Sequence, residues 1–369
     1  MCKAKVSRIV ISFTIIALLF TCLAGCGQKQ AGEEQLANTS AGRTIVDMAG
    51  RSHTVPAEVD KIFSTSPVGT IMTYSLAPDK LIGWNYVLRE GEKKFVLKEY
   101  QDLPDLGGWY AKATCNTEEL LKINPDVIIS MGFITDTSVS QADKIQEQIG
   151  IPVIMVDGEL ANLDKAYEFM GDLFDEEEKA KELGEYCRDT VAELQEKVKG
   201  ISEDKKVRVY YAEGAAGLQT DPQGSMHTEV LDMAGGINVA EVVQKGGMGM
   251  AAVSLEQVIL WNPELILSWG TEQGGYFESI FTDPKWESIQ AVKDKRVYAV
   301  PAGPFNWFDR PPSINRVLGL KWVANLLYPD VFTYDIRQET KDFYSKFYHY
   351  ELSDKEVDGL LQYSIPQSQ

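Results

Sequence analysis

Short apolar runs alternate with stretches of helical periodicity along most of this chain. The apolar runs predict strands at residues 81–83, 127–129, 153–156, 207–211, 265–267 and 297–300, and helical patterns lie between them, for example at 118–123 and 140–149. Apolar residues fill consecutive positions of these runs, which is typical of parallel strands buried on both faces. The pattern therefore predicts an α/β fold with helices on both faces of parallel sheets.

Two segments of the chain follow the same pattern. Residues 116–132 and 254–270 align at a constant offset of 138, and each reads as a capped helix, an Asn-Pro break, a short buried strand and a glycine. This interval is far longer than the repeat of a solenoid, which is roughly 20–50 residues. The repeat predicts two similar lobes, and a cleft between lobes is a common place for a ligand.

A long helix is predicted between the two halves. Residues 176–199 contain no proline and one internal glycine, and their apolar positions form one stripe at helical spacing: Ala180, Leu183, Cys187, Val191, Leu194 and Val198. At a rise of 1.5 Å per residue such a helix spans roughly 36 Å, enough to cross from one lobe to the other. A single rigid strut would permit the lobes to tilt by a small angle only.

The start of the chain has the pattern of a secretory signal peptide. Lys3, Lys5 and Arg8 precede an apolar run at 9–20, and Leu-Ala-Gly-Cys follows at 23–26. The run is shorter than the roughly 20 residues that span a bilayer, so a membrane anchor is the weaker interpretation. The last four residues resemble the lipobox of bacterial lipoproteins, which implies lipidation of Cys26 and a flexible leash after it.

These features predict an ordered set of segments. They are a lipoprotein signal peptide at 1–25, a lipid-anchored leash at 26–42, a first α/β lobe at 43–174, a linker helix at 175–200, a second α/β lobe at 201–330 and a helical C-terminal extension at 331–369. The predicted fold is thus two Rossmann-like lobes with parallel sheets, joined by one long rigid helix.

Charge and motifs exclude several classes of function. Acidic residues number 54 against 36 basic ones, giving a net charge of −18, and no basic stripe is present, so nucleic acid is not an expected partner. Beyond Cys26 only Cys115 and Cys187 remain, which is neither a disulfide framework nor a zinc pattern. No Gly-x-Ser-x-Gly, His-Glu-x-x-His or phosphate-binding loop occurs, so no catalytic residues are expected.

Several segments together resemble the iron-complex and cobalamin-type periplasmic binding proteins, the substrate receptors of ABC importers. They are the hairpin-like residues 44–56, Asn-Pro-Asp-Val-Ile at 124–128, the long helix, and Gly-Gly-Ile-Asn-Val-Ala at 235–240. The likeness extends from about residue 44 to 328. One departure is that Ile71 follows Thr70, where family members often carry Thr-Glu.

The resemblance implies a monomeric receptor outside the cytoplasm, held to the cell membrane by the lipid on Cys26. It would capture a small molecule and deliver it to a permease dimer with a cytoplasmic ATPase, and it would need no cofactor of its own. The expected cargo is an iron-siderophore chelate; a corrinoid, haem and molybdate are the alternatives. A ligand-sensing domain and an extracellular enzyme are the other classes of function that we consider.

The resemblance also assigns a role to one glutamate in each copy of the repeat. In the family, one acidic residue of each lobe docks onto arginines of the membrane subunits, and the matching positions are Glu118 and Glu256. The alternative is purely local: both follow good N-cap residues, Asn116 and Ser254, and acids in a first helical turn favour the helix dipole. Both roles can hold at once.

Ligand-binding candidates lie in loops that follow predicted strands, where open α/β sheets bind ligands. The primary candidates are Trp84, Trp109, Tyr110, Phe133, His227, Trp269, Trp307 and Arg310. The same loops contain Asn85, Tyr86, Glu213, Gln219, Phe305, Asn306, Phe308 and Asp309. Aromatic residues suit a bulky conjugated or chelated ligand, although we expect about half of them to fill the core instead.

Arg310 and the histidines are the polar groups of most interest. Arg310 would suit a carboxylate, hydroxamate or oxyanion, or else an ion pair with Asp309, whereas Arg316 is expected to be structural. The histidines after the leash are His53, His227 and His349, too few and too dispersed for a site of several imidazoles, so no metal site is expected. For His227 a surface position at a helix start is favoured over an axial haem ligand.

Overall fold

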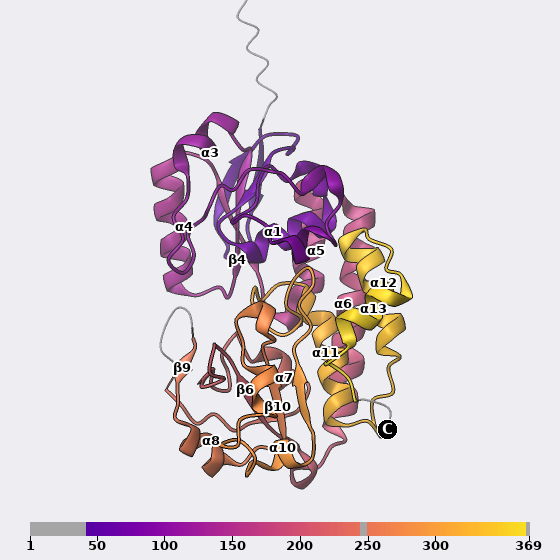
Figure 1. Cartoon of the computed structure of the whole chain (residues 1–369). Coiled ribbons are helices and arrows are strands. Elements are labelled where there is room, and N and C mark those ends of the chain that lie inside the picture. Colours follow the sequence, from indigo (N-terminus) through magenta and orange to yellow (C-terminus); the bar gives the residue numbers. More distant parts are fainter. Residues whose placement is uncertain (1–41, 244–248, 367–369) are drawn as a thin grey trace, which may run out of the picture. The chain divides into compact units, whose positions relative to one another are not determined.

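Two parallel sheets organise residues 42–243 and 249–366, the part of the chain described by the computed structural model (Figure 1). The first sheet has the order β3-β4-β5, with β3 Ile62–Ser64, β4 Val127–Gly132 and β5 Val153–Asp157. The second has the order β11-β10-β6-β8, with β6 Arg208–Ala212, β8 Ile237–Asn238, β10 Leu265–Ser268 and β11 Val297–Ala299. All neighbouring strands within these sheets are parallel, which confirms the predicted fold class.

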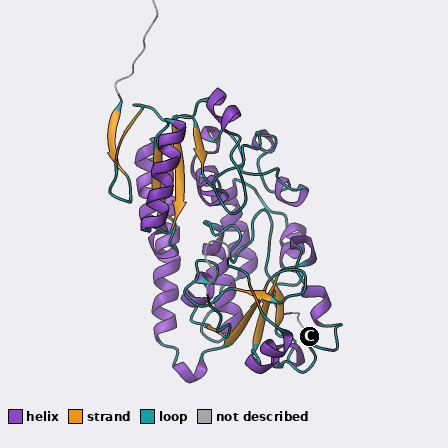
Figure 2. Ribbon diagram, turned by 90° about the vertical axis from the view of Figure 1, so that its left-hand side faces the viewer, coloured by secondary structure: helices purple, strands orange, loops and turns teal. Residues whose placement is uncertain are grey.

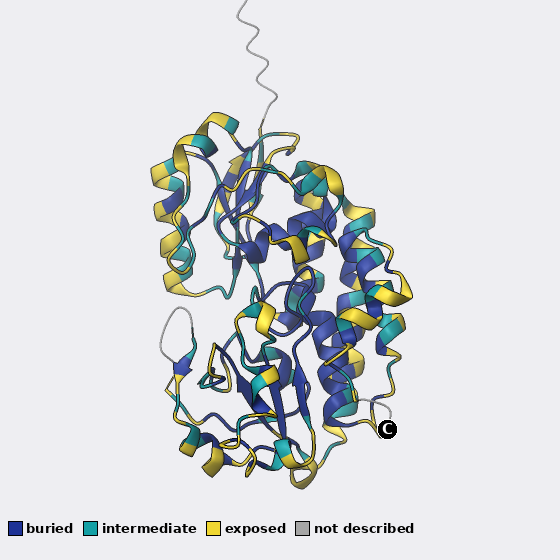
Figure 3. Cartoon of the chain, in the orientation of Figure 1, coloured by how far each residue is buried: buried dark blue, intermediate teal, exposed yellow. Residues whose placement is uncertain are grey.

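Each sheet is buried on both faces because alternate residues of one strand enter different cores. In β4, Val127 and Ile129 join the largest core, whereas Ile128 joins a separate core beneath α3 and α4. In β6, Val209 and Tyr211 face the same large core, and Tyr210 and Ala212 face a third. This two-sided burial explains the uninterrupted apolar runs of the sequence, and Figure 3 shows the strands of both sheets as buried.

The predicted strand at 81–83 is wrong. Leu81 makes only an isolated bridge to Ile62. The backbone then leaves the sheet, because the N–H of Trp84 donates to the carbonyl of Pro104 instead.

The first lobe contains the hairpin and most of the early helices. Its remaining elements are β1 Arg43–Val46, β2 Ser52–Val55, α1 Pro67–Leu76, η1 Pro78–Lys80, α2 Glu90–Lys93, η2 Lys98–Tyr100, α3 Thr117–Ile123, α4 Asp136–Ile149, η3 Leu160–Asn162 and α5 Leu163–Phe174. The hairpin at 44–56 is antiparallel, and Asp47 in its turn accepts a hydrogen bond from the N–H of Met155 in β5.

The second lobe and the C-terminal region contain the other elements. They are η4 Glu203–Lys205, β7 Gln219–Thr220, α7 Glu229–Met233, β9 Ala251–Ala252, α8 Leu255–Trp261, η5 Thr271–Gln273, α9 Phe277–Ile280, α10 Gln290–Lys293, α11 Asn315–Leu327, α12 Ile336–Tyr348 and α13 Asp354–Leu361. Figure 2 shows the two sheets as separate groups of strands.

The long linker helix is present as α6, Glu177–Lys199. The predicted stripe is buried from Ala180 to Leu194, and Val198 is half-buried. Helix α5 packs closely along α6, since a Cβ on Gly171 would lie 2.4 Å from the Cβ of Ala180. The largest core continues through α6, α11 and α12 into both lobes, so the linker is a packed element rather than an exposed strut.

The sequence repeat is a structural repeat. Asn116 caps α3 by accepting from the N–H of Glu119, and Ser254 caps α8 by accepting from the N–H of Gln257. Both helices end at an asparagine in the left-handed conformation, Asn124 with φ 54° and Asn262 with φ 43°. Asparagine tolerates this conformation, and the proline that follows cannot continue the helix, which explains the Asn-Pro break.

The predicted signal peptide, Cys26 and the leash up to residue 41 lie outside the described residues. Among the residues that are described, no helix is both long enough and apolar enough to cross a membrane.

Candidate ligand-binding site

A cavity of about 490 Å³ is lined by loops of both lobes. The first lobe contributes Ser66, Pro67, Val68, Tyr86, Arg89, Tyr110, Ala111 and Met131, and the second contributes Met226, His227, Trp269, Gln273, Ala302, Asn306, Arg310, Pro311 and Pro312. Several of these residues directly follow a parallel strand, as Trp269 follows β10. The cavity therefore lies at the carboxyl ends of the strands, the usual binding edge of open α/β sheets.

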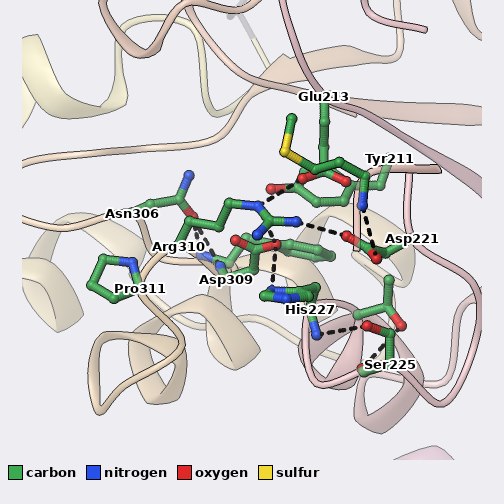
Figure 4. Close-up of polar contacts among 12 residues, drawn as sticks. Tyr211, Glu213, Asp221, Ser225, His227, Asn306, Asp309, Arg310 and Pro311 are labelled. Carbon is green, nitrogen blue, oxygen red and sulfur yellow. Dashed lines mark hydrogen bonds and ion pairs between the residues drawn. The ribbon is translucent and has the colours of Figure 1, made fainter. Parts of the chain in front are cut away.

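Arg310 is the centre of a buried ionic cluster at the cavity wall (Figure 4). Its Nε lies 2.9 Å from Oε1 of Glu213 and 3.3 Å from Oδ2 of Asp309, and its Nη2 lies 2.8 Å from Oδ2 of Asp221. The side chains of the three acids are 0% exposed, and the side chain of Arg310 is 21% exposed. The ion pair with Asp309, one of the two alternative roles of Arg310, is thus present, and none of these contacts uses Nη1.

Aromatic side chains pack beside this ionic cluster where it borders the cavity. The ring of Trp269 lies 5.8 Å from Cζ of Arg310, and its indole N–H donates to the hydroxyl of Tyr211 at 2.5 Å. Tyr110 donates its hydroxyl to the carbonyl of Asn85. Because these polar tips are already bonded, Trp269 and Tyr110 offer the cavity mainly their apolar faces.

Burial shifts the protonation equilibria of the cluster. Burial, together with the charge of Asp309, raises the pKa of Glu213 to about 9, although the guanidinium of Arg310 opposes the shift. Burial alone would lower the pKa of Arg310, but the charges of Asp309 and Glu213 outweigh it and raise that pKa. Three buried carboxyl groups share one cation, so we infer that Glu213 retains a proton at neutral pH.

His227 is buried, not on the surface as predicted. It is 8% exposed, and its Nδ1 lies 3.3 Å from Oδ2 of Asp309. The reason is local: residues 222–228 form tight turns before α7, in which the N–H of Ser225 donates to the carbonyl of Pro222. These turns bring the imidazole against the loop that contains Asp309.

The structure brings four of the eight primary candidates to the cavity: Tyr110, His227, Trp269 and Arg310. Trp84 and Trp307 instead fill the core, at 2% and 0% exposure, with Trp307 packed edge-on against Trp322. Trp109 packs against Phe63, and Phe133 is half-buried away from the lining. Trp84, Trp109 and Trp307 pack into the hydrophobic cores, the alternative expected for about half of the aromatics.

Other predicted side chains also divide between the cavity and the interior. Tyr86 and Asn306 line the cavity, whereas Asn85, Glu213, Gln219, Phe305, Phe308 and Asp309 lie behind or beside it. Arg316 is fully buried and donates to the carbonyl of Gly158 at 2.7 Å, which confirms its structural role.

Sequence analysis missed Asp221, Arg89 and Gln273. Asp221 follows a two-residue strand that no hydrophobic pattern reveals, and Arg89 and Gln273 lie in short irregular helical segments or beside them. No spacing signal connects any of them to Arg310. Asp221 could have been suspected only from the Asp-Pro-Gln-Gly turn that it begins.

Two lobes with parallel sheets, one long linker helix and a cavity at the strand ends define a two-lobed solute receptor. The family model of the periplasmic binding proteins matches residues 87–304. The chain belongs to this family, whose members serve as extracytoplasmic substrate-binding proteins of ABC transporters and are not enzymes.

Particular relatives support this assignment. A solved ABC transporter solute-binding protein from Sulfurospirillum deleyianum is 34% identical, with a TM-score of 0.81, covering 87% of this chain and 99% of that one. The molybdate-binding protein MolA of Haemophilus influenzae is 29% identical over 84% of this chain and 91% of its own. Its molybdate-bound structure gives a TM-score of 0.66 at 25% identity, over 84% of this chain and 99% of that chain. The Bacillus subtilis substrate-binding lipoprotein YvrC is 25% identical over 84% of this chain and 94% of its own.

Proposed function

We propose that the chain captures an anionic metal chelate of the siderophore type and delivers it to an ABC permease. The observation that carries this proposal is the cavity itself, which combines aromatic and apolar walls with the guanidinium of Arg310. Tyr86, Tyr110 and Trp269 offer flat faces to a conjugated ligand. Arg310 and His227 face the same space and suit its acidic groups.

The size of the cavity favours an organic ligand. Its volume of about 490 Å³ lies within the range of roughly 300–1,000 Å³ that is typical of sites for organic molecules of drug size. A chelate would fill this space and contact both lobes, which is how a two-lobed receptor gains a closed, bound state.

Molybdate is the second candidate, because MolA binds it and shares most of the length of this chain. A tetrahedral oxyanion needs donors rather than apolar walls. Arg310 retains Nη1, and His227 presents its second ring nitrogen, so the second lobe alone offers two donors to such an ion. A small oxyanion would leave most of the cavity to water.

Tryptophan fluorescence of the purified protein, titrated with ferric siderophores, haem, cobalamin and molybdate, tests the proposed cargo. We expect saturable quenching by a ferric siderophore at submicromolar concentration, because Trp269 forms part of the wall. Saturable binding of molybdate alone would replace the chelate with the oxyanion. Absence of quenching by every ligand of the panel would contradict both the chelate and the molybdate as cargo.

Two tryptophan variants locate the ligand within the structure. Trp269→Leu should weaken binding by about two- to tenfold, the effect of losing an aromatic contact of roughly 0.5–1.5 kcal/mol. Trp109→Leu is the matched control, since Trp109 does not line the cavity, and it should leave the affinity unchanged. Equal losses in both variants would place the ligand elsewhere.

We propose that the receptor acts as a monomer whose two lobes each contact one permease subunit through one glutamate. Glu118 in α3 and Glu256 in α8 occupy equivalent positions of the repeat, and both are exposed. Neither is required to hold its helix, because the caps are made by Asn116 and Ser254. The repeat therefore presents two similar acidic helix starts, one from each lobe.

We further propose that Cys26 is lipidated and anchors the receptor to the cell membrane. The pattern of residues 1–26 supports this, and YvrC is described as a lipoprotein. In the native host, Cys26→Ser should move the receptor from the membrane fraction to the soluble or secreted fraction. Immunoblotting of the fractions measures this, and full retention of the variant in the membrane would contradict the anchor.

A further inference from the structure

Asp221, His227 and Asp309 converge from three separate loops beside the cavity (Figure 4). Each can offer one ligand atom, and these atoms all lie within 4.8 Å of one another. Asp221 follows β7, His227 precedes α7, and Asp309 lies in the loop between β11 and α11. Asp221 and Asp309 are 0% exposed and His227 is 8% exposed, so the cluster is interior and not a group of surface acids.

Two of the three side chains in this cluster, His227 and Asp309, have buried polar atoms without a hydrogen-bond partner in the described part of the chain. Within the described residues, neither carboxylate oxygen of Asp309 accepts a hydrogen bond, and Nδ1 of His227 has none either. Buried polar atoms of native proteins are nearly always bonded to protein, water or an ion. Nδ1 of His227 and Oδ2 of Asp309 lie 3.3 Å apart as an ion-pair contact, but neither these atoms nor Oδ1 of Asp309 are hydrogen-bonded to any described residue, and a bound ion would satisfy all three.

The excess of negative charge in the cluster indicates that the bound group is a cation. Glu213, Asp221 and Asp309 carry up to three negative charges without exposure to water, and Arg310 supplies one positive charge. Buried charges without compensation are costly, and part of the surplus is relieved by the raised pKa of Glu213. With all three carboxylates ionised the surplus is two negative charges, and a divalent cation would neutralise both without requiring Glu213 to hold a proton.

We propose that Asp221, His227 and Asp309 bind one divalent first-row transition-metal ion. One imidazole and two carboxylates are a ligand set that suits zinc, manganese, iron or nickel, whereas calcium and magnesium prefer oxygen alone. Three protein ligands leave coordination positions open, and His227 also lines the cavity, so a bound ion would adjoin the cargo. The inference does not depend on the identity of the cargo.

The arrangement is held in place before any ion arrives. The N–H of His227 donates to Oγ of Ser225 at 3.2 Å, and the N–H of Asp309 donates to Oδ1 of Asn306 at 3.0 Å. Arg310 donates to one oxygen of Asp221, the N–H of Met250 donates to the other at 3.2 Å, and Arg310 lies near one oxygen of Asp309; each carboxylate oxygen keeps a further lone pair. The guanidinium then acts as a fixed neighbour that orients the acids.

The test is calorimetric titration of the full chain with Zn²⁺ and Mn²⁺, after removal of metal with EDTA and dialysis and with no cargo present. We expect one ion per chain. Asp309→Asn and His227→Gln should each weaken binding by at least about tenfold, since loss even of groups that only support ligands costs 10–100-fold. Glu213→Gln is the matched control: it changes a carboxylate of the same cluster outside the ligand set, and should retain one ion per chain.

Visible absorption of Co²⁺ added to the metal-free protein gives a second measurement. We expect ligand-field bands in the wild type that are lost in His227→Gln, with folding of each variant verified by circular dichroism. Should Asp309→Asn fail to fold, the His227 variant carries the test. Absence of stoichiometric metal in the wild type, or unchanged binding in His227→Gln, would overturn the site. Either result leaves the cargo titration, which is made without added Zn²⁺, Mn²⁺ or Co²⁺, to be judged separately.

Discussion

Reversing the charges of Glu118 and Glu256 together to lysine should reduce cargo uptake by at least about a hundredfold while the affinity for cargo stays unchanged. The proposed contacts are with permease arginines, and like charges placed opposite each other across an interface cost several kcal/mol. Both glutamates are exposed and lie on helices outside the cavity lining. Loss of a first-turn acid costs a helix only about 0.3–1 kcal/mol, so the variant should fold.

Uptake by cells and affinity of the purified receptor are measured in parallel for this double variant. The matched control is Glu185→Lys with Glu196→Lys, which makes the same change in net charge at two exposed positions of α6. Normal uptake in the control and loss in the Glu118 and Glu256 variant would support docking. Wild-type uptake in both would show that these glutamates serve only their own helices.

Replacing Arg310 with glutamine should lower the free energy of unfolding at neutral pH by about 3–5 kcal/mol, because removal of one partner leaves buried carboxylates without compensation. Glu213, Asp221 and Asp309 all contact this guanidinium and are 0% exposed. The same variant should weaken binding of an anionic cargo by at least tenfold, about 1.4 kcal/mol. Urea unfolding and the fluorescence titration measure the two effects.

Arg89→Gln is the matched control, because Arg89 also lines the cavity but its side chain is 63% exposed. Its partner Glu92 is buried but keeps hydrogen bonds from the hydroxyl of Tyr86 and the backbone N–H of residue 89, so loss of the Arg89 side chain should cost less stability than loss of Arg310. Arg310→Lys keeps the positive charge but loses the planar set of N–H donors of the guanidinium. The stability of this variant should therefore lie between those of the wild type and Arg310→Gln. Equal stability of Arg310→Gln and Arg89→Gln would contradict the structural role assigned to the buried cluster.

Most of the architecture follows from the sequence because it depends on local periodicity. The runs around Ile128 and Ile266 are apolar at every position, and only a sheet covered on both faces buries both sets of side chains. Asn124 and Asn262 end their helices by local backbone preference, so the repeat could be aligned without coordinates. Residues 81–83 do not continue as a strand because the N–H of Trp84 bonds to the carbonyl of Pro104, and no local pattern reveals this contact.

The position of an aromatic side chain within a loop was not predictable in the same way. Trp269 and Trp307 both follow strands in the second lobe, yet one lines the cavity and the other packs against Trp322 of α11. Which face of a loop turns inward depends on the helix that covers it, and that contact is absent from any local pattern. The surface prediction for His227 failed because the turns at 222–228 bring its imidazole against the loop of Asp309, which is distant in the sequence.

Local sequence patterns were sufficient to predict two α/β lobes, one linker helix, equivalent helix starts at Glu118 and Glu256, and Arg310 as a group of interest. That Glu213, Asp221 and Asp309 surround Arg310, and that His227 joins them, became visible in the folded chain alone. These residues lie up to 97 positions apart in the chain and come from different loops. Hydrophobic periodicity determines which elements form, whereas the ionic cluster depends on where the ends of three strands meet in space.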